Sequence, residues 1–142
     1  AEKGAKEIRL INRSFDRANT IADEFGGPIS PVKWEDRANA LAGCAMAINA
    51  TSQGMQGTEP LDIDLAELPL DALVADIIYI PKETPFLAAA RQRGNRTVNG
   101  LGMLLHQGRP AWKLWFDVDV EVTKELRAKI EATLEGLSLT PR

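Results

Sequence analysis

The sequence predicts an α/β protein built on a doubly wound parallel sheet. Short runs of β-type residues alternate along the chain with longer segments of helical periodicity. The runs at 45–48 and 72–81 are almost continuously apolar, which is typical of strands covered by helices on both faces. Polar residues follow these runs directly. In a parallel sheet such residues line the carboxyl edge, where ligands bind.

Composition limits the classes of protein to consider. A chain of 142 residues suits one domain with a real core and is too short for two ordinary ones. The net charge of −3 gives no general attraction to nucleic acid or anionic membranes, so an anion site must be local. Cys44 is the single cysteine, and neither a spanning apolar stretch nor a leader is evident. We therefore expect a cytoplasmic protein with no membrane or nucleic-acid partner.

The first half of the chain reads as strand, helix, strand and short helix. The apolar residues of 7–11 indicate a strand, and Ser14 is a suitable N-cap for a helix that runs to Phe25. Gly26 and the two residues after it end this helix. A short edge-type strand at 29–34, interrupted by a proline, and a short helix at 35–41 follow.

The second half repeats the alternation. Strands are predicted at 45–48, 72–81 and 96–100, and Asp76 stands out in the otherwise apolar second run. A buried aspartate needs hydrogen-bond partners, which the sequence does not identify. Thr84-Pro85 starts a helix that Gly94 closes. Two helices, at 101–116 and 120–134, complete the chain.

A pair of arginines marks the corner after the first strand. Arg13 and Arg17 lie four residues apart, so they share one face of the following helix. They can simply be solvated at a helix start, or they can bind a phosphate. In dinucleotide-binding sheets an acidic residue at such a corner binds the ribose 2′-hydroxyl of NAD, whereas arginine accommodates the 2′-phosphate of NADP. No acidic residue precedes Asp16 here, and the spacing alone leaves both interpretations open.

Four longer segments bear on this choice. In order, the chain carries INRSFDRANTIADEF, INATSQGM, DIIYIPKETPFLAAARQRG and NGLGMLLHQGRPAWKLW. Together they closely resemble the C-terminal, cofactor-binding half of shikimate dehydrogenase, from about Gly4 to the final helix. The resemblance implies a Rossmann-like fold, NADP as cofactor and the reversible reduction of 3-dehydroshikimate to shikimate in aromatic amino-acid biosynthesis.

The resemblance also implies roles for individual residues. The first corner would bind the adenosine ribose and 2′-phosphate, the stretch after the strand at 45–48 would pass beside the cofactor, and two further residues would border the nicotinamide. These cofactor-binding residues are Asn12, Arg13, Ser14, Arg17, Asn49, Ala50, Thr51, Ser52, Ile77 and Gly100. Tyr79 and Gln107 would hydrogen-bond the substrate. The absence of a side chain at Gly100 would permit close approach of the nicotinamide.

Other parts of such an enzyme are expected outside this chain. The fold is expected to lack its first strand and glycine-rich turn, which would stand just before Ala1. The lysine and aspartate that the resemblance implies for proton transfer belong to an N-terminal substrate domain. We therefore assign no catalytic residue and no metal ligand here. Residues 1–142 are predicted to be a partial NADP-binding domain, with helices from about 101–142 packing back toward that missing domain.

Two alternatives remain at this point. The parent protein can be a quinate/shikimate dehydrogenase that uses NAD. Taken literally, the chain can be an inactive nucleotide-binding or assembly module, since we expect this fragment alone to lack activity. Its unpaired strand edges also predict that it is not an independently stable monomer. The expected partners are a small-molecule substrate and the missing domain, and the oligomeric state stays open, with a homodimer among the alternatives.

Overall fold

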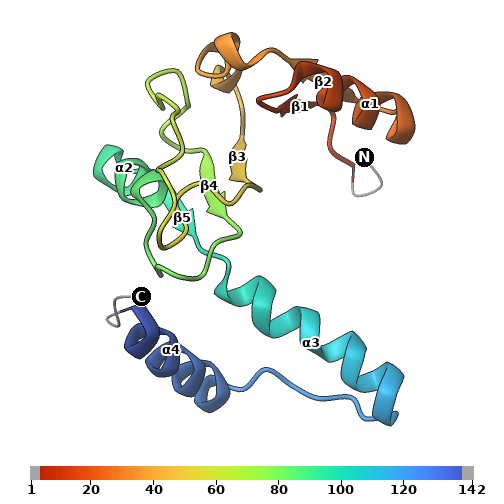
Figure 1. Cartoon of the computed structure of the whole chain (residues 1–142), viewed down its shortest axis with the longest axis vertical. Helices are drawn as coiled ribbons and strands as arrows, with labels where there is room; N and C mark the ends of the chain where they lie inside the picture. The colour runs from red at the N-terminus through yellow and green to blue at the C-terminus, as the bar shows by residue number, and fades with distance from the viewer. Residues whose placement is uncertain (1–3, 139–142) are drawn as a thin grey trace. The chain divides into compact units, whose positions relative to one another are not determined.

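The computed structural model describes residues 4–138 and divides into two compact units (Figure 1). The first unit comprises the chain up to Cys44 together with Ile63–Pro69. The second comprises Ala45–Asp62 and the chain from Leu70 onward. Each unit contains its own parallel sheet, so the predicted α/β class is confirmed.

The first unit is a strand–helix–strand unit. Strands β1 (Ile8–Ile11) and β2 (Ile29–Val32) pair in parallel, with Ile8 opposite Ile29. Helix α1 (Phe15–Phe25) connects them and packs against both, with Ala18 fully buried (Figure 1). β2 ends two residues earlier than the sequence predicts.

The start of α1 lies where the sequence places it. The Ser14 hydroxyl accepts a hydrogen bond from the Arg17 amide at 3.4 Å, which caps the helix. The Asn12 side-chain oxygen accepts from the Ser14 amide at 3.0 Å and fixes the turn that leaves β1. At the other end, the Gly26 amide donates to the Ala22 carbonyl. Local capping therefore sets both ends of this helix.

Arg9 connects β1 by hydrogen bonds to residues 40–44 of the same unit. Its guanidinium donates to the carbonyls of Ala40 at 2.9 Å and Ala42 at 2.7 Å, and one nitrogen lies 3.7 Å from the Cys44 sulfur. The other two nitrogens form a fork with the Glu7 carboxylate, both at 3.0 Å. This fork, more than its charge attraction, lowers the pKa of Glu7 and raises that of Arg9.

We expect Arg9→Met to lower the urea midpoint of the first unit more than Glu7→Gln does. The methionine loses the carbonyl contacts as well as the ion pair, whereas Gln removes only an exposed pair. The Glu7 carboxylate has a lowered pKa in the folded state, so its contribution is present above its ordinary pKa of 4.5 and is lost as pH falls through the lowered value. The difference between the parent chain and Glu7→Gln should therefore vanish in acid. A difference that persists there would contradict the ion pair.

The short helix predicted at 35–41 is wrong as a single element. The structure has two 3₁₀ turns instead, Trp34–Asp36 and Asn39–Leu41. Each is closed by i→i+3 bonds, which is the common form of helical pieces too short to propagate. The Arg37 guanidinium stacks 4.7 Å from the centre of the Trp34 ring and donates to the Trp34 carbonyl. These local contacts hold the first turn.

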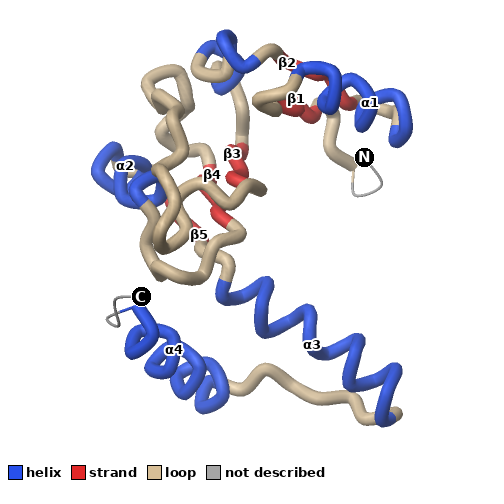
Figure 2. The backbone as a smooth tube through the Cα atoms, in the orientation of Figure 1, coloured by secondary structure: helices blue, strands red, loops and turns tan. Residues whose placement is uncertain are grey.

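The second unit contains a three-stranded parallel sheet (Figure 2). β4 (Leu73–Asp76) lies between β3 (Met46–Asn49) and β5 (Arg96–Val98). Helix α2 (Pro85–Arg93) connects β4 to β5 and packs against both strands. The core of this unit consists mainly of apolar side chains: Ala47, Ala72, Val74, Ile78, Phe86, Leu87, Ala90 and Leu101.

The strand predicted over 72–81 is much shorter in the structure. β4 ends at Asp76 because its carboxylate accepts a hydrogen bond from the Ile78 amide at 3.0 Å, which turns the chain out of the sheet. The apolar residues beyond it form a loop, not a strand. The prediction failed because apolar character was taken for strand structure, while the local side-chain bond decides where the strand ends.

Capping sets the limits of α2 as the sequence predicts. The Thr84 hydroxyl accepts from the Leu87 amide at 3.3 Å, and Pro85 occupies the first helical position. Gly94 ends the helix at φ = 97°, a left-handed conformation that favours glycine. Asn95 then donates to the carbonyls of Leu70 at 3.1 Å and Ala72 at 3.2 Å, joining the end of α2 to the start of β4.

Two helices follow the sheet. α3 (Leu101–Phe116) has the predicted bounds. α4 (Lys124–Ser138) begins four residues later than predicted: the Thr123 hydroxyl accepts from the Leu126 amide at 3.1 Å, while the Val120 carbonyl accepts from the Arg109 side chain at 2.7 Å. Within residues 4–138, no helix is long and apolar enough to cross a membrane.

Candidate functional site

The carboxyl edge of the β3–β4–β5 sheet brings three predicted site segments together. The Ile77 amide donates to the Asn49 carbonyl at 3.1 Å, which joins the ends of β4 and β3. The Gly100 amide donates to the Ile78 carbonyl at 2.9 Å, which joins the start of α3 to the loop after β4. The convergence that parallel topology predicts is therefore confirmed within this unit.

Gly100 has a role inside the fold that the sequence did not reveal. A Cβ atom at this position would overlap the carbonyl group of Ile77 and touch that of Ile78. The missing side chain thus lets the first turn of α3 lie directly on the loop after β4. Ile77 and Gly100, both predicted to border the nicotinamide, are in direct contact, and Ile77 stays partly exposed.

Asn49 lies beneath the loop that follows β3. Its side chain is 2% exposed and all of its polar atoms are engaged within the protein. The amide nitrogen donates to the Gln53 carbonyl at 3.0 Å, and the oxygen accepts from the Thr51 amide at 3.0 Å and hydroxyl at 2.8 Å. Ala50, Thr51 and Ser52 are exposed. A ligand can therefore meet these three residues, whereas Asn49 shapes the loop from below.

Asp76 is the residue whose partners sequence reasoning missed. Its buried carboxylate accepts from the Asn49 amide at 3.2 and 3.3 Å, from the Thr84 hydroxyl at 2.7 Å and from the Ile78 amide. The signal in the sequence is an aspartate in an apolar run with a helix-capping threonine eight residues later. Asp76 therefore satisfies donors from three different segments.

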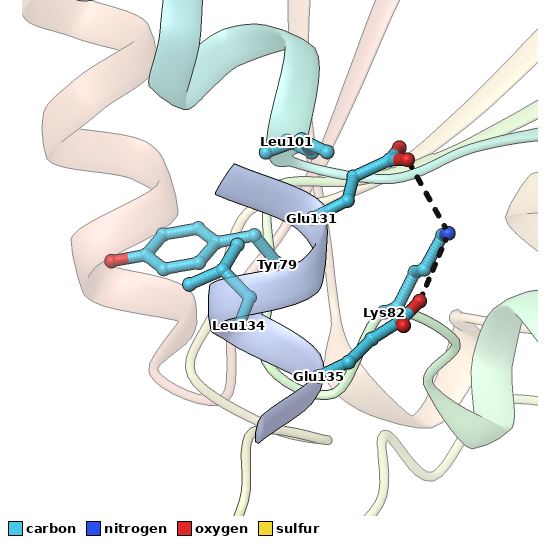
Figure 3. Close-up of a pocket in the computed structure, with 6 residues that line it drawn as sticks. All are labelled: Tyr79, Lys82, Leu101, Glu131, Leu134 and Glu135. Atoms are coloured by element: carbon cyan, nitrogen blue, oxygen red, sulfur yellow. Dashed lines mark hydrogen bonds and ion pairs between the residues drawn. The ribbon is translucent and has the colours of Figure 1, made fainter. Parts of the chain in front are cut away.

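Tyr79 lies beside a small pocket between the loop after β4 and helix α4 (Figure 3). Lys82 pairs there with Glu135 at 3.4 Å and Glu131 at 3.8 Å. The tyrosine ring lies along Leu134, and its hydroxyl points away from the ion pairs (Figure 3). The cavity of ≈ 10 Å³ has room for about one water molecule, so a substrate would have to meet Tyr79 from the side of its hydroxyl.

Gln107 extends the site along α3. It is exposed and lies seven residues after Gly100, about 10 Å along the helix axis at 1.5 Å per residue. Two turns of helix bring it back to nearly the same face. Its position is therefore compatible with a group that begins at Gly100 and extends along the helix.

The arginine corner belongs to the first unit. Both Arg13 and Arg17 are exposed, and neither guanidinium has an ion-pair partner among residues 4–138. Arg13 precedes the N-cap Ser14 and so lies outside α1, whereas Arg17 lies in its first turn; the prediction that both share one face of the helix is therefore wrong, although both lie beside its capped amino terminus. Two free guanidiniums next to a helix amino terminus suit a phosphate group.

Within residues 4–138, no group of three or more His, Cys, Asp or Glu side chains is placed to hold a metal ion. Cys44 is a free, half-buried cysteine whose thiol donates to the Ala40 carbonyl at 3.3 Å. Together with its contact to Arg9, this bond makes Cys44 part of the packing of the first unit.

Comparison with known proteins gives a consistent picture. The chain is 51% identical over 133 residues to shikimate dehydrogenase (NADP(+)) of Nitrobacter hamburgensis, a match that covers 94% of this chain and 47% of that protein. The chain spans about half the length of the curated relatives it matches. No family model matches it.

Solved structures share the fold. Quinate dehydrogenase from Corynebacterium glutamicum, in complex with NAD, is 26% identical with a TM-score of 0.82 over 92% of this chain and 48% of that one. Shikimate 5-dehydrogenase from Thermus thermophilus, in complex with NADP(H) and shikimate, is 26% identical with a TM-score of 0.73 over 95% and 47%. The match covers about half the length of these proteins but nearly the whole of this chain. By its sequence and its Rossmann-like fold, this chain is a homologue of the shikimate dehydrogenases.

Proposed function

We propose that this chain is the NADP-binding part of a shikimate dehydrogenase, which reversibly reduces 3-dehydroshikimate to shikimate in the cytoplasm. One observation carries the proposal: 51% identity over 94% of the chain to a protein named as the NADP(+) enzyme. The three segments that converge at the carboxyl edge of the second sheet support it, since a dinucleotide binds at that edge in such folds.

The chain's own residues fit the cofactor. Arg13 and Arg17, free of other partners in the described residues, would hold the 2′-phosphate, and Asn12 and Ser14 the adjoining ribose. The loop of Ala50, Thr51 and Ser52, held by Asn49, would flank the cofactor. Ile77 and the backbone of Gly100 would border its nicotinamide. When bound, NADPH supplies the hydride.

Tyr79 and Gln107 would bind the substrate through its hydroxyl and carboxylate groups. Both offer hydrogen-bond donors, and neither is assigned a proton-transfer role. Proton transfer is proposed to belong to a lysine and an aspartate of the substrate domain.

A quinate dehydrogenase that uses NAD is the second candidate, because such an enzyme shares the fold with a TM-score of 0.82. Its 26% identity is half that of the Nitrobacter hamburgensis protein, which favours shikimate and NADP. Assays of the complete protein with each substrate and each cofactor separate the two. Shikimate oxidation with NADP⁺ should dominate, and faster quinate oxidation with NAD⁺ would refute the proposal.

The carboxyl-terminal helices carry an exposed aromatic surface that fits the proposal that this chain is only part of a larger protein. The second half of α3 exposes Trp112, Trp115 and Phe116; the Phe116 ring centre lies 5.0 Å from that of Trp112 and 6.4 Å from that of Trp115, and Trp115 is 71% exposed. Such a patch marks an interaction surface more often than a solvated face. We propose that the substrate domain covers it in the whole protein, and that a homodimer of this chain would use the same patch.

We expect the chain by itself to associate in a concentration-dependent manner, since this patch has no cover in the described structure. Trp115→Glu should weaken the association about tenfold, because a carboxylate is then desolvated at the contact. Sedimentation equilibrium measures it. Gln92→Glu, on the exposed side of α2, adds the same charge elsewhere and should have little effect. Equal effects of the two variants would argue against the patch.

A further inference from the structure

We propose that Asp76 is a positioning residue that holds the Asn49–Gln53 loop in place through the side chain of Asn49. This set of hydrogen bonds from Asp76 through Asn49 to the loop, called the clamp below, follows from the structure of the second unit. It rests on the proposed function only in assigning this loop to the cofactor.

Every polar group that faces the Asp76 carboxylate donates a hydrogen bond to it. The residue is 2% exposed, so water does not share these bonds. The Thr84 hydroxyl already accepts from the Leu87 amide, and its own proton is therefore free to point at the carboxylate, 2.7 Å away. The Ile78 amide donates at 3.0 Å and the Asn49 side chain at 3.2 and 3.3 Å. A carboxylate accepts without donating, so it fits this set of donors.

The Asp76 carboxylate and the Gln53 carbonyl, both acceptors of the Asn49 amide nitrogen, together determine which way the Asn49 amide group faces. Because the amide nitrogen must point to Asp76, the amide oxygen must point to the loop, where it accepts from the Thr51 amide and hydroxyl. The Thr51 oxygen in turn accepts from the Gln53 amide at 3.1 Å. The chain of bonds thus runs from a buried acceptor to the backbone of a loop whose outer residues are exposed.

An amide at position 76 would remove the part of this constraint that Asp76 supplies and leave only the Gln53 carbonyl to orient Asn49. Its NH₂ group could face the Asn49 NH₂ group, which is unfavourable, or Asn49 could turn over and present its nitrogen to the Thr51 amide. Either arrangement costs the loop at least one bond of its network. The shape of the core would be unchanged, because Asn and Asp are nearly isosteric.

The test compares Asp76→Asn with Thr84→Val. Each variant changes one polar side chain of the same buried network, but Thr84 has no bond to Asn49. Amide hydrogen exchange of Thr51 and Gln53, measured by NMR, should accelerate about tenfold in Asp76→Asn, the effect of losing one buried hydrogen bond. In Thr84→Val it should not, once both are normalised to the exchange of Val74 in β4.

The outcomes are distinguishable. Unchanged loop exchange in Asp76→Asn, or equal acceleration in both variants, overturns the clamp. Should Asp76→Asn fail to fold, Asp76→Ser, which keeps one oxygen and creates no clash, is judged by the same criterion. Titration with NADP⁺ then tests the proposed function separately. Faster exchange with a several-fold higher Kd supports both, whereas faster exchange with an unchanged Kd upholds the clamp and removes the loop from the cofactor site.

Discussion

Gly100→Ala is expected to destabilise the second unit by about 3 kcal/mol or more, the upper range for an overpacked site. The added methyl group would overlap the Ile77 carbonyl, and a backbone group cannot move aside as a flexible side chain can. The conformation of residue 100 is not the cause, because its φ of −71° suits alanine. The effect is therefore purely steric.

The same variant should also move apart two segments of the candidate site, the start of α3 and the loop after β4. Relieving the overlap requires α3 to move away from the loop after β4, which weakens the 2.9 Å bond from the Gly100 amide to the Ile78 carbonyl. Urea denaturation followed by circular dichroism measures the stability. Exchange of the Gly100 amide hydrogen reports the bond itself.

Gly102 provides a matched control two residues further along α3. A Cβ atom there would meet no heavy atom within 4 Å. Gly102→Ala should therefore be neutral or stabilise the helix by up to about 1 kcal/mol, since alanine is the better helix former. A similar loss of stability in both variants would show that the close approach at Gly100 is not what matters.

Replacing Arg13 and Arg17 together with glutamine is expected to weaken NADP⁺ binding by at least about 100-fold while changing NAD⁺ binding by less than about threefold. Two charge-assisted contacts to the 2′-phosphate are lost, each contributing about 1.5–3 kcal/mol. NAD⁺ has a hydroxyl group at that position and gains little from the guanidiniums. Isothermal titration with both cofactors gives the ratio directly.

Adenosine 2′,5′-bisphosphate isolates the corner from the rest of the cofactor. It should lose affinity in the double variant as NADP⁺ does, and the loss should shrink at high salt. Arg96→Gln, which removes an exposed arginine of β5, controls for net charge. Equal weakening of NADP⁺ and NAD⁺ would contradict the assignment of these arginines to the 2′-phosphate.

Sequence patterns located most elements because local chemistry fixes them. Ser14 and Thr84 cap helices where they were expected, and Gly94 ends α2 in the left-handed conformation. The patterns failed where a local hydrogen bond from a side chain, and not the apolar pattern, sets the end of an element. Asp76 ends β4 five residues early, and Thr123 rather than Val120 starts the last helix.

The sequence by itself determined the α/β class, the parallel strands and the polar segments that follow them, since alternation and polarity are properties of consecutive residues. Only the tertiary structure decided what Asp76 binds and why Gly100 has no side chain. Those answers depend on Asn49, Thr84 and Ile77, residues distant along the chain that only the folded backbone brings within bonding distance.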